Sequence, residues 1–351
     1  MINKDNSIAV VEKLTGLKGE IVSKPNNIIT YEASAKLPET TSDKNNGLHT
    51  NAFNTTIVSH TFENGVGTIE FEEDVTTIGY KAFSYCSGLS TINIPNSVTE
   101  IESWAFEGSD FNTLIIPNSV TTIGHNAFDN CTNLTSVTLS NNLTYIDDCV
   151  FQDCIGLLDI TIPSGVTFIG DSTFQYCSSL TSVTIPNSVT RIGGRAFRSC
   201  SSLTSIDIPD SVTSIGNSAF EYCGLTSINI PNGITTINEG VFAGCSSLIT
   251  VVISNNIISI GVSAFNNCSG LISVTIGSGV TSIGGLAFQS CNSLESITSL
   301  ATTAPTIQSS TFDNVKVNGS LYVPQGSTGY DVWMDTINYY LGYYNWTKIE
   351  Q

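Results

Sequence analysis

Cysteine is the residue type with the most regular spacing in this 351-residue chain, and it can bind metals, form disulfides or act as a nucleophile. A metal site needs two to four ligands that converge, as in CxxC spacing, and a single cysteine in each repeat does not provide that. We therefore expect no metal and no cofactor. We interpret the cysteines as buried free thiols that act as small apolar fillers in a chain assembled in a reducing compartment, with disulfides between neighbours as the alternative. Nine of the ten follow a phenylalanine by three residues, namely Cys86, Cys131, Cys154, Cys177, Cys200, Cys223, Cys245, Cys268 and Cys291.

Histidine and the carboxylates do not form a catalytic pattern. Hydrolysis of the triad kind needs a base beside a nucleophile, and the three histidines, His49, His60 and His125, fall outside the repeat or in different parts of it. The acidic runs at 72–74 and 147–148 could touch calcium but match no known calcium loop, so we interpret them as solvated surface. The sequence predicts no catalytic residue and no enzyme activity.

The arginines are more informative because basic residues are so scarce. Between Lys81 and Lys316 the chain has only Arg191, Arg195 and Arg198, all within one repeat. On a chain with a formal charge of −18 they predict one focal positive spot.

An aromatic pair is expected beside that spot. At the position before the second core isoleucine of each repeat, Tyr145, Phe168 and Arg191 occur in three consecutive repeats, where the others carry mostly small polar residues. Exposed aromatic rings next to an arginine are typical of interfaces and can stack on sugars. We predict that Tyr145, Phe168, Arg191 and Arg195 form a ligand-binding surface, with packing of the two rings under neighbouring side chains as the alternative.

The elements that position these residues follow from a repeat. Phenylalanines recur at intervals of 22 or 23 along the chain, and one unit, residues 180–200, has apolar residues at 180, 183, 185, 189, 192, 196 and 197. Such a unit cannot bury its apolar face alone, so neighbours must stack. The phenylalanines are Phe83, Phe106, Phe128, Phe151, Phe174, Phe197, Phe220, Phe242, Phe265 and Phe288.

Within a coil, the alternation around 183–185 predicts a short strand that Pro186 ends, and a second extended piece follows at 189–192. Gly193 and its equivalents, sometimes Asn or Asp, predict a left-handed turn position. Ala196 and Phe197 are expected to open a single helical or 3₁₀ turn. The outward strand residues, such as Thr138, Thr161 and Thr184, form a hydroxyl and amide row that could bind glycan or be plain surface.

The period divides the chain into three parts. Residues 1–55 lack the repeat and hold six of the nine lysines, so we predict an attachment or assembly segment. Residues 56–300 are the solenoid, which starts with a half-coil at 67–71. Residues 301–351 hold a degenerate repeat and an aromatic tail, and we predict that they form the C-terminal cap.

The unit Leu-x-x-Ile-x-Ile-Pro-x-Ser-Val-Thr-x-Ile-Gly-x-x-Ala-Phe-x-x-Cys resembles the BspA-like leucine-rich repeats over about residues 65–315. The resemblance implies a β-rich leucine-rich-repeat solenoid of the α/β class, with about ten coils, each of about 22–23 residues, and a cap at each end. It also implies adhesion, since the family includes surface proteins that bind host proteins or other cells, and related arrays look to be virion appendages of phages. It carries no catalytic residues.

Charge and hydropathy restrict the partners. The net charge of −18 disfavours nucleic acid, and no stretch approaches the roughly 18 apolar residues that a membrane span needs. The first residues, Met1 to Asn6, show no secretory or lipoprotein signal. We therefore expect a phage virion appendage, a tail or head fibre that binds a bacterial surface protein or glycan. Its virion partners would bind residues 1–55, and a homo-oligomer is another option. The alternative is an adhesin on a bacterial or protist cell surface.

Overall fold

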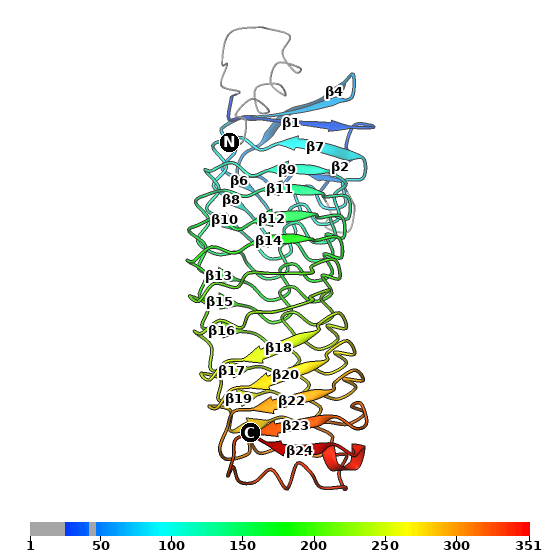
Figure 1. Ribbon diagram of the computed structural model, residues 1–351. Helices are drawn as coiled ribbons and strands as arrows, with labels where there is room; N and C mark the ends of the chain where they lie inside the picture. The colour runs from blue at the N-terminus through cyan, green and yellow to red at the C-terminus, as the bar shows by residue number, and fades with distance from the viewer. Residues whose placement is uncertain (1–24, 42–46) are drawn as a thin grey trace, which may run out of the picture.

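The computed structural model describes residues 25–41 and 47–351, and the chain in it winds into a single β-solenoid. Figure 1 shows the coils stacked in one column, from the strands at the N-terminal end to β24 (Thr347–Glu350) at the other. The predicted repeat solenoid is confirmed. It has about 12 turns rather than about ten, because the degenerate Phe312 repeat and the C-terminal tail, which ends in β24, also stack on the regular coils. No helix in the described part of the chain is long and apolar enough to cross a membrane.

Each coil contributes up to two short strands, and equivalent strands of successive coils pair in parallel, residue by residue, as Ser182 of one coil with Asp159 of the coil before it. The first row runs through β9 (Thr113–Ile115), β11 (Ser136–Thr138), β12 (Asp159–Thr161), β14 (Ser182–Thr184), β18 (Thr250–Ile253), β20 (Ser273–Ile276), β22 (Ser296–Ser299), β23 (Ser320–Val323) and β24. The second runs through β6 (Thr77–Ile78), β8 (Glu100–Ile101), β10 (Thr122–Ile123), β13 (Phe168–Ile169), β15 (Arg191–Ile192), β16 (Ser214–Ile215), β17 (Thr236–Ile237), β19 (Ser259–Ile260) and β21 (Ser282–Ile283).

Proline sets the length of the first strand, as predicted. β14 ends just before Pro186, which has no N–H for the ladder. Where Ser254 and Gly277 stand in place of proline, β18 and β20 extend further, to Ile253 and Ile276. β11 still ends at Thr138 although Ser140 stands in place of proline, and both coils next to it carry the proline.

The core is a continuous column of phenylalanine rings. Rings of successive coils are nearly parallel, with centroids 5.2–5.8 Å apart from Phe83 to Phe312. This spacing lies in the range of favourable offset stacking. Phe53 covers the first ring at 5.8 Å, and Trp333 covers the last at 5.3 Å. The ring column therefore meets an aromatic cover at each end.

The segment around each phenylalanine is a tight turn, and the predicted helical turn is wrong. The residues two before and two after the ring have positive φ, as Arg195 (55°) and Ser199 (61°) show around Phe197. In this conformation the N–H groups of all three residues point at the next coil, where they donate to the carbonyls of residues 217, 219 and 221 at 2.7–2.9 Å. A helical turn would direct these N–H groups back along its own chain.

Gly193 and its equivalents are not left-handed, so that prediction is also wrong. They are glycine for lack of space: a Cβ on Gly193 would lie 2.5 Å from the carbonyl carbon of Gly170, and one on Gly216 would lie 2.3 Å from the nitrogen of Gly194. Gly193 donates its N–H to the carbonyl of Ile169 at 2.8 Å. The coils thus approach closely wherever this row holds glycine, although Glu102, Asp147 and Asn238 occupy the equivalent position in three coils.

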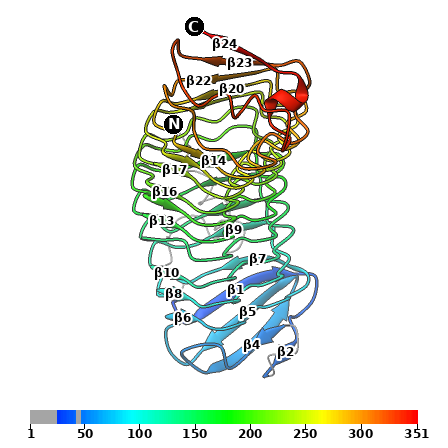
Figure 2. The same ribbon diagram turned by 90° about the horizontal axis from the view of Figure 1, so that it is seen from below.

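The N-terminal end differs from the predicted half-coil. β5 (Val66–Phe71) lies between β4 (Ile57–Glu63) and β1 (Ile28–Ala33), and β1 continues to β7 (Leu89–Asn93), all antiparallel. Figure 2 shows this sheet across the end of the column. A small parallel pair, β2 (Glu39–Thr40) and β3 (Leu48–His49), lies beside it. The predicted attachment segment, residues 1–55, stays a prediction, and its parts 1–24 and 42–46 lie outside the described residues.

The C-terminal end is covered by the aromatic tail. Trp333 is buried and donates its indole N–H to the carbonyl of Pro305 at 3.0 Å, while the Tyr330 hydroxyl donates to Ser299 Oγ at 2.6 Å. The 3₁₀ helix η1 (Leu341–Tyr344) leads into β24, the last strand of the row. The tail satisfies polar groups as well as covering rings.

The close packing of adjacent coils at Gly193 can be tested by substitution. Gly193→Ala is expected to lower the free energy of unfolding by about 2 kcal/mol or more, because overpacking against fixed backbone costs roughly 1–3 kcal/mol. Gly194→Ala is the matched control, since its Cβ would meet nothing nearer than 3.3 Å. Urea denaturation followed by circular dichroism measures both, and equal midpoints for the two variants would contradict the close-packing explanation.

Candidate binding surface

Three of the four predicted residues, Tyr145, Phe168 and Arg191, lie side by side on the second strand row, whereas Arg195 lies on the following turn. Phe168 in β13 is directly opposite Arg191 in β15, and a bridge between Ile146 and Ile169 places Tyr145 beside Phe168. The Arg191 guanidinium carbon lies 4.9 Å from the centre of the Phe168 ring, within cation–π range. Tyr145 is 37% exposed, so its ring is available to a partner.

The three arginines differ in their charge partners. Arg198 is neutralised by Glu221, whose carboxylate lies 2.7 Å from its Nε, and also lies over the Tyr222 ring at 5.9 Å. Arg191 and Arg195 are exposed and form no salt bridge within residues 25–41 and 47–351. Arg195 sits on the turn before Phe197, away from the strand row of the other three. We define the arginine surface as Tyr145, Phe168, Arg191 and Arg195.

The cysteines are free thiols, as the spacing predicts, and nine of the ten are buried. Eight donate an S–H hydrogen bond to the carbonyl of the phenylalanine one coil earlier, for example Cys200 to Phe174 at 3.2 Å. Ser109 replaces cysteine in one coil, and its hydroxyl donates to Phe83 in the same way at 2.6 Å. The thiol is therefore a hydrogen-bond donor as well as a filler. Burial raises the pKa of Cys245 and of Cys291 to about 12, which keeps them protonated.

The histidines lie apart from one another. His60 bridges Tyr31 Oη at 2.7 Å and Glu39 Oε1 at 2.8 Å, and it links the β2 segment to the N-terminal sheet. Burial lowers the pKa of His60, although the hydrogen bond to Glu39 opposes this, and the same bond lowers the pKa of Glu39. His125 lies 3.4 Å from Asp147 on the solenoid. His49 is buried under the first coil.

One acidic side chain lies in an unfavourable place. Burial, together with the carboxylates of Asp153 and Glu107 in the adjacent coils, raises the pKa of Asp129 to about 6. A hydrogen bond from Asn126 Nδ2 at 3.1 Å partly compensates. Across residues 25–41 and 47–351, no three His, Cys, Asp or Glu side chains are grouped so that they could hold a metal ion.

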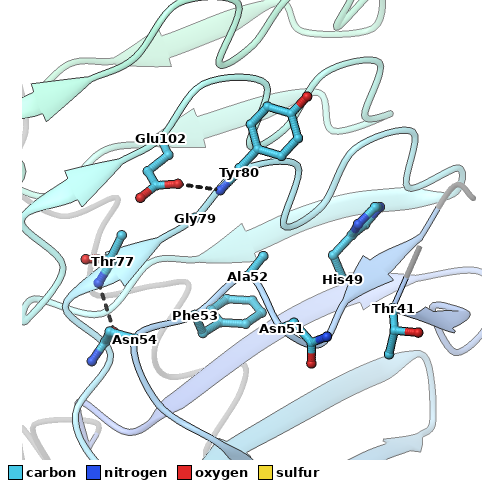
Figure 3. Close-up of a pocket in the computed structure, with 10 residues that line it drawn as sticks. All are labelled: Thr41, His49, Asn51, Ala52, Phe53, Asn54, Thr77, Gly79, Tyr80 and Glu102. Atoms are coloured by element: carbon cyan, nitrogen blue, oxygen red, sulfur yellow. Dashed lines mark hydrogen bonds between the residues drawn. The ribbon is translucent and has the colours of Figure 1, made fainter. Parts of the chain in front are cut away.

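A pocket that was not predicted from the sequence lies at the N-terminal end, as Figure 3 shows. It has a volume of about 410 Å³ and lies between the segment 49–54 and the first two coils. Tyr80 stands on one side, and Trp104 and His125 continue its aromatic row across the next coils, with centroids 5.6 and 6.1 Å apart. A weak signal was present in the sequence, because Tyr80 and His125 directly follow the glycines at 79 and 124, while Trp104, between them, is shifted by one position within its repeat.

Comparison with known proteins identifies the repeat. The sequence model of the BspA type leucine-rich repeat region matches in six copies over residues 55–181, 167–295 and 265–328. A search of curated proteins returns no match.

Solved structures share the fold. A leucine-rich repeat protein from Bacteroides ovatus is 23% identical, with 90% of this chain and 99% of that chain covered and a TM-score of 0.56. One from Eubacterium ventriosum is 22% identical, with 89% and 99% covered and a TM-score of 0.51. A leucine rich cell surface protein from Faecalibacterium prausnitzii is 29% identical over 75% of this chain and 87% of that chain, with a TM-score of 0.47.

Thiol burial is directly measurable. In the native protein, Ellman's reagent is expected to leave the nine buried cysteines unreacted, and to react slowly with half-buried Cys149, whose pKa burial raises to about 11. After unfolding in guanidinium without reductant, all ten should react at once. A smaller total would reveal disulfides, and several fast native thiols would contradict the burial.

Asp129 predicts a pH dependence of stability. Its carboxyl has a pKa of about 6 in the folded chain against an ordinary 3.8, so the native state gains stability as the pH falls from 6 towards 4. Asp129→Asn should therefore raise the melting temperature at pH 7.5, and the gain should shrink at pH 4.5. Asp207→Asn removes the same charge from an exposed position outside the strands and serves as the control. An equal gain in both variants would mean that only net charge matters.

Proposed function

The chain belongs to the BspA-type leucine-rich repeat family, and we propose on that basis that it is a bacterial cell-surface protein that binds a protein or glycan on an opposing surface. The family's repeat supplies a rigid scaffold, and the arginine surface supplies the contact. The single observation that carries the site is the exposed Arg191 guanidinium stacked on Phe168, without a salt bridge among the described residues.

The chemistry of the arginine surface favours an anionic partner. Arg191 and Arg195 are positive and free of salt bridges within the described chain, on a chain whose formal charge is −18, so a ligand carboxylate, sulfate or phosphate would find its counter-charge here. Stacking on Phe168 holds the Arg191 side chain extended and lowers the entropy lost on binding. Tyr145 adds an amphipathic ring at the edge, which can donate or accept a hydrogen bond.

A role without catalysis fits the same geometry. The histidines at 49, 60 and 125 occupy three separate places, and the buried thiols are held protonated, so neither set supplies a base beside an exposed nucleophile. The exposed columns of side chains vary from coil to coil while the backbone repeats. This combination is typical of binding proteins.

The cell surface replaces the virion as the main proposal for where the chain is displayed. The family includes surface adhesins, and neither the repeat match nor the solved structures above name a virion protein. Virion partners for residues 1–55, and a homo-oligomer built through them, have no observation in their favour among the described residues.

Binding to intact cells tests the proposal. Fluorescent beads coated with the purified chain are expected to adhere to cultured epithelial cells, and Arg191→Ala should reduce the bound beads about tenfold, equivalent to roughly 1.4 kcal/mol. Phe168→Ala should act in the same direction, because it removes the stacking support. Thr236→Ala, in the same row three coils from Phe168, is the control. Antibody against the chain should label intact source cells.

Two results would contradict the proposal that the chain is displayed on a cell surface and binds through the arginine surface. Adhesion that Arg191→Ala and Phe168→Ala leave unchanged would exclude the arginine surface. Antibody label on purified virions from the culture, with none on intact cells, would restore the virion appendage.

A further inference from the structure

The pocket in Figure 3 is built on a rigid floor. The segment 49–54 crosses the first coil, where the Gly79 N–H donates to the carbonyl of Ala52 at 2.7 Å and the His49 N–H donates to the carbonyl of Ala82 at 2.9 Å. A Cβ on Gly79 would lie 2.6 Å from that Ala52 oxygen, so the two backbones are in direct contact. The pocket is thus present before any ligand binds.

Side chains of the same segment lock it in place. Asn54 Oδ1 accepts the N–H groups of Thr76 and Thr77 at 2.8 and 3.0 Å, and its Nδ2 donates to the carbonyl of Asp74 at 3.1 Å. The Phe53 ring packs against Phe71, with centroids 4.8 Å apart. A preformed pocket of this kind loses little conformational entropy on binding.

An aromatic row forms one wall and continues beyond it. Tyr80 is 43% exposed, and its ring lies edge-on to Trp104, which lies edge-on to His125. Three rings on three consecutive coils extend over about 10 Å at the strand spacing of roughly 4.8 Å. Because successive rings are nearly perpendicular, a saccharide can stack its C–H face on one ring, Tyr80, while the edge of the next ring lies beside it.

The polar groups select the ligand class. Glu102 uses Oε2 to accept the Tyr80 N–H at 2.7 Å, and Oε1 accepts no hydrogen bond from the described residues. Asn51 is exposed at the rim and has an amide that can both donate and accept. Carboxylate and amide groups bind vicinal hydroxyls, whereas the negative charge repels an anionic ligand. The volume of about 410 Å³ is that of a small-molecule site.

We propose that this pocket is a binding site for an uncharged saccharide, which stacks on Tyr80 next to Trp104 and gives its hydroxyl hydrogen bonds to Glu102 and Asn51. Glu102 is the one carboxylate in the pocket lining of the described chain, and glycoside hydrolysis ordinarily uses two, so the site binds and does not cleave. It is separate from the arginine surface, which is suited to anions. Its existence does not depend on the proposed function.

Tryptophan fluorescence reports on this site selectively. The chain has three tryptophans, and Trp333 and Trp346 are buried in the C-terminal cap, which leaves half-buried Trp104 as the responsive one. Titration of the full chain with cellobiose, maltose, lactose and N,N′-diacetylchitobiose is expected to change the emission saturably for at least one of them, with a Kd on the order of 1 mM. Calorimetry with that disaccharide gives an independent value.

Variants decide whether the signal comes from the pocket. Tyr80→Ala should weaken binding at least about tenfold, as should Glu102→Gln, which keeps an acceptor for the Tyr80 N–H. Tyr222→Ala removes a similarly exposed tyrosine elsewhere and should bind as the parent does, as should Arg191→Ala. Two outcomes overturn the proposal: no saturable change with any disaccharide up to about 50 mM, or binding that Tyr80→Ala and Glu102→Gln leave intact.

Discussion

Backbone hydrogen bonding from each coil to the next is the constraint on which the rest of this structure depends. A single coil has no partner within itself for most of its N–H groups, so they must meet carbonyls of the neighbouring coil. On the phenylalanine side this requires two left-handed residues per coil, such as Arg195 and Ser199, at a local cost of about 1–2 kcal/mol each. The aligned bonds from Arg195, Phe197 and Ser199 offset that cost. A coil without its neighbour would keep the strain and lose the bonds, so stacking and coil shape are inseparable.

The side chains that point into the core are also aligned from one coil to the next. Phe174 and Phe197 stack because their backbones are in register, and the Cys200 thiol reaches the Phe174 carbonyl for the same reason. Ser109 shows that the donor function matters in this column, since serine keeps the bond while it is smaller than cysteine. Threonines on the outer surface also bond to the preceding coil. The Thr190 hydroxyl, for example, donates a hydrogen bond to the carbonyl of Thr167. Much of the polar surface is thus used by the fold.

Features that recur with the period could be predicted from the sequence. Predictions were wrong where one residue type can stand at a position for either of two structural reasons. Apolar spacing, Pro186 and the recurrent ring predicted the coils, the strand end and the core correctly. The prediction of a left-handed conformation at Gly193 was wrong, because a glycine can indicate either a left-handed backbone or a lack of space for a Cβ, and the sequence does not distinguish the two. The left-handed residues escaped notice because Arg195 has no such preference and is held by its neighbours. The side-by-side placement of Tyr145, Phe168 and Arg191 was predictable from the row, and their role in binding stays a prediction. The pocket was not predictable, because it needs the segment 49–54, which lies outside the period.

Binding surfaces on such a molecule arise where the repetition is broken. Within the regular coils, equivalent outward positions lie side by side, so a change of residue type in successive coils, as at Phe168 and Arg191, produces a patch without altering the backbone. A hollow also forms on the regular coils, where Asn232, Val252 and Thr275 are among the residues that line a second pocket of about 380 Å³. The pocket beside Tyr80 exists because a segment from outside the repeat crosses the first coils and bridges them at Gly79 without filling the space beside it. The solenoid therefore offers charge-based contacts along its length and an open pocket at its N-terminal end, where an irregular segment meets the first coils.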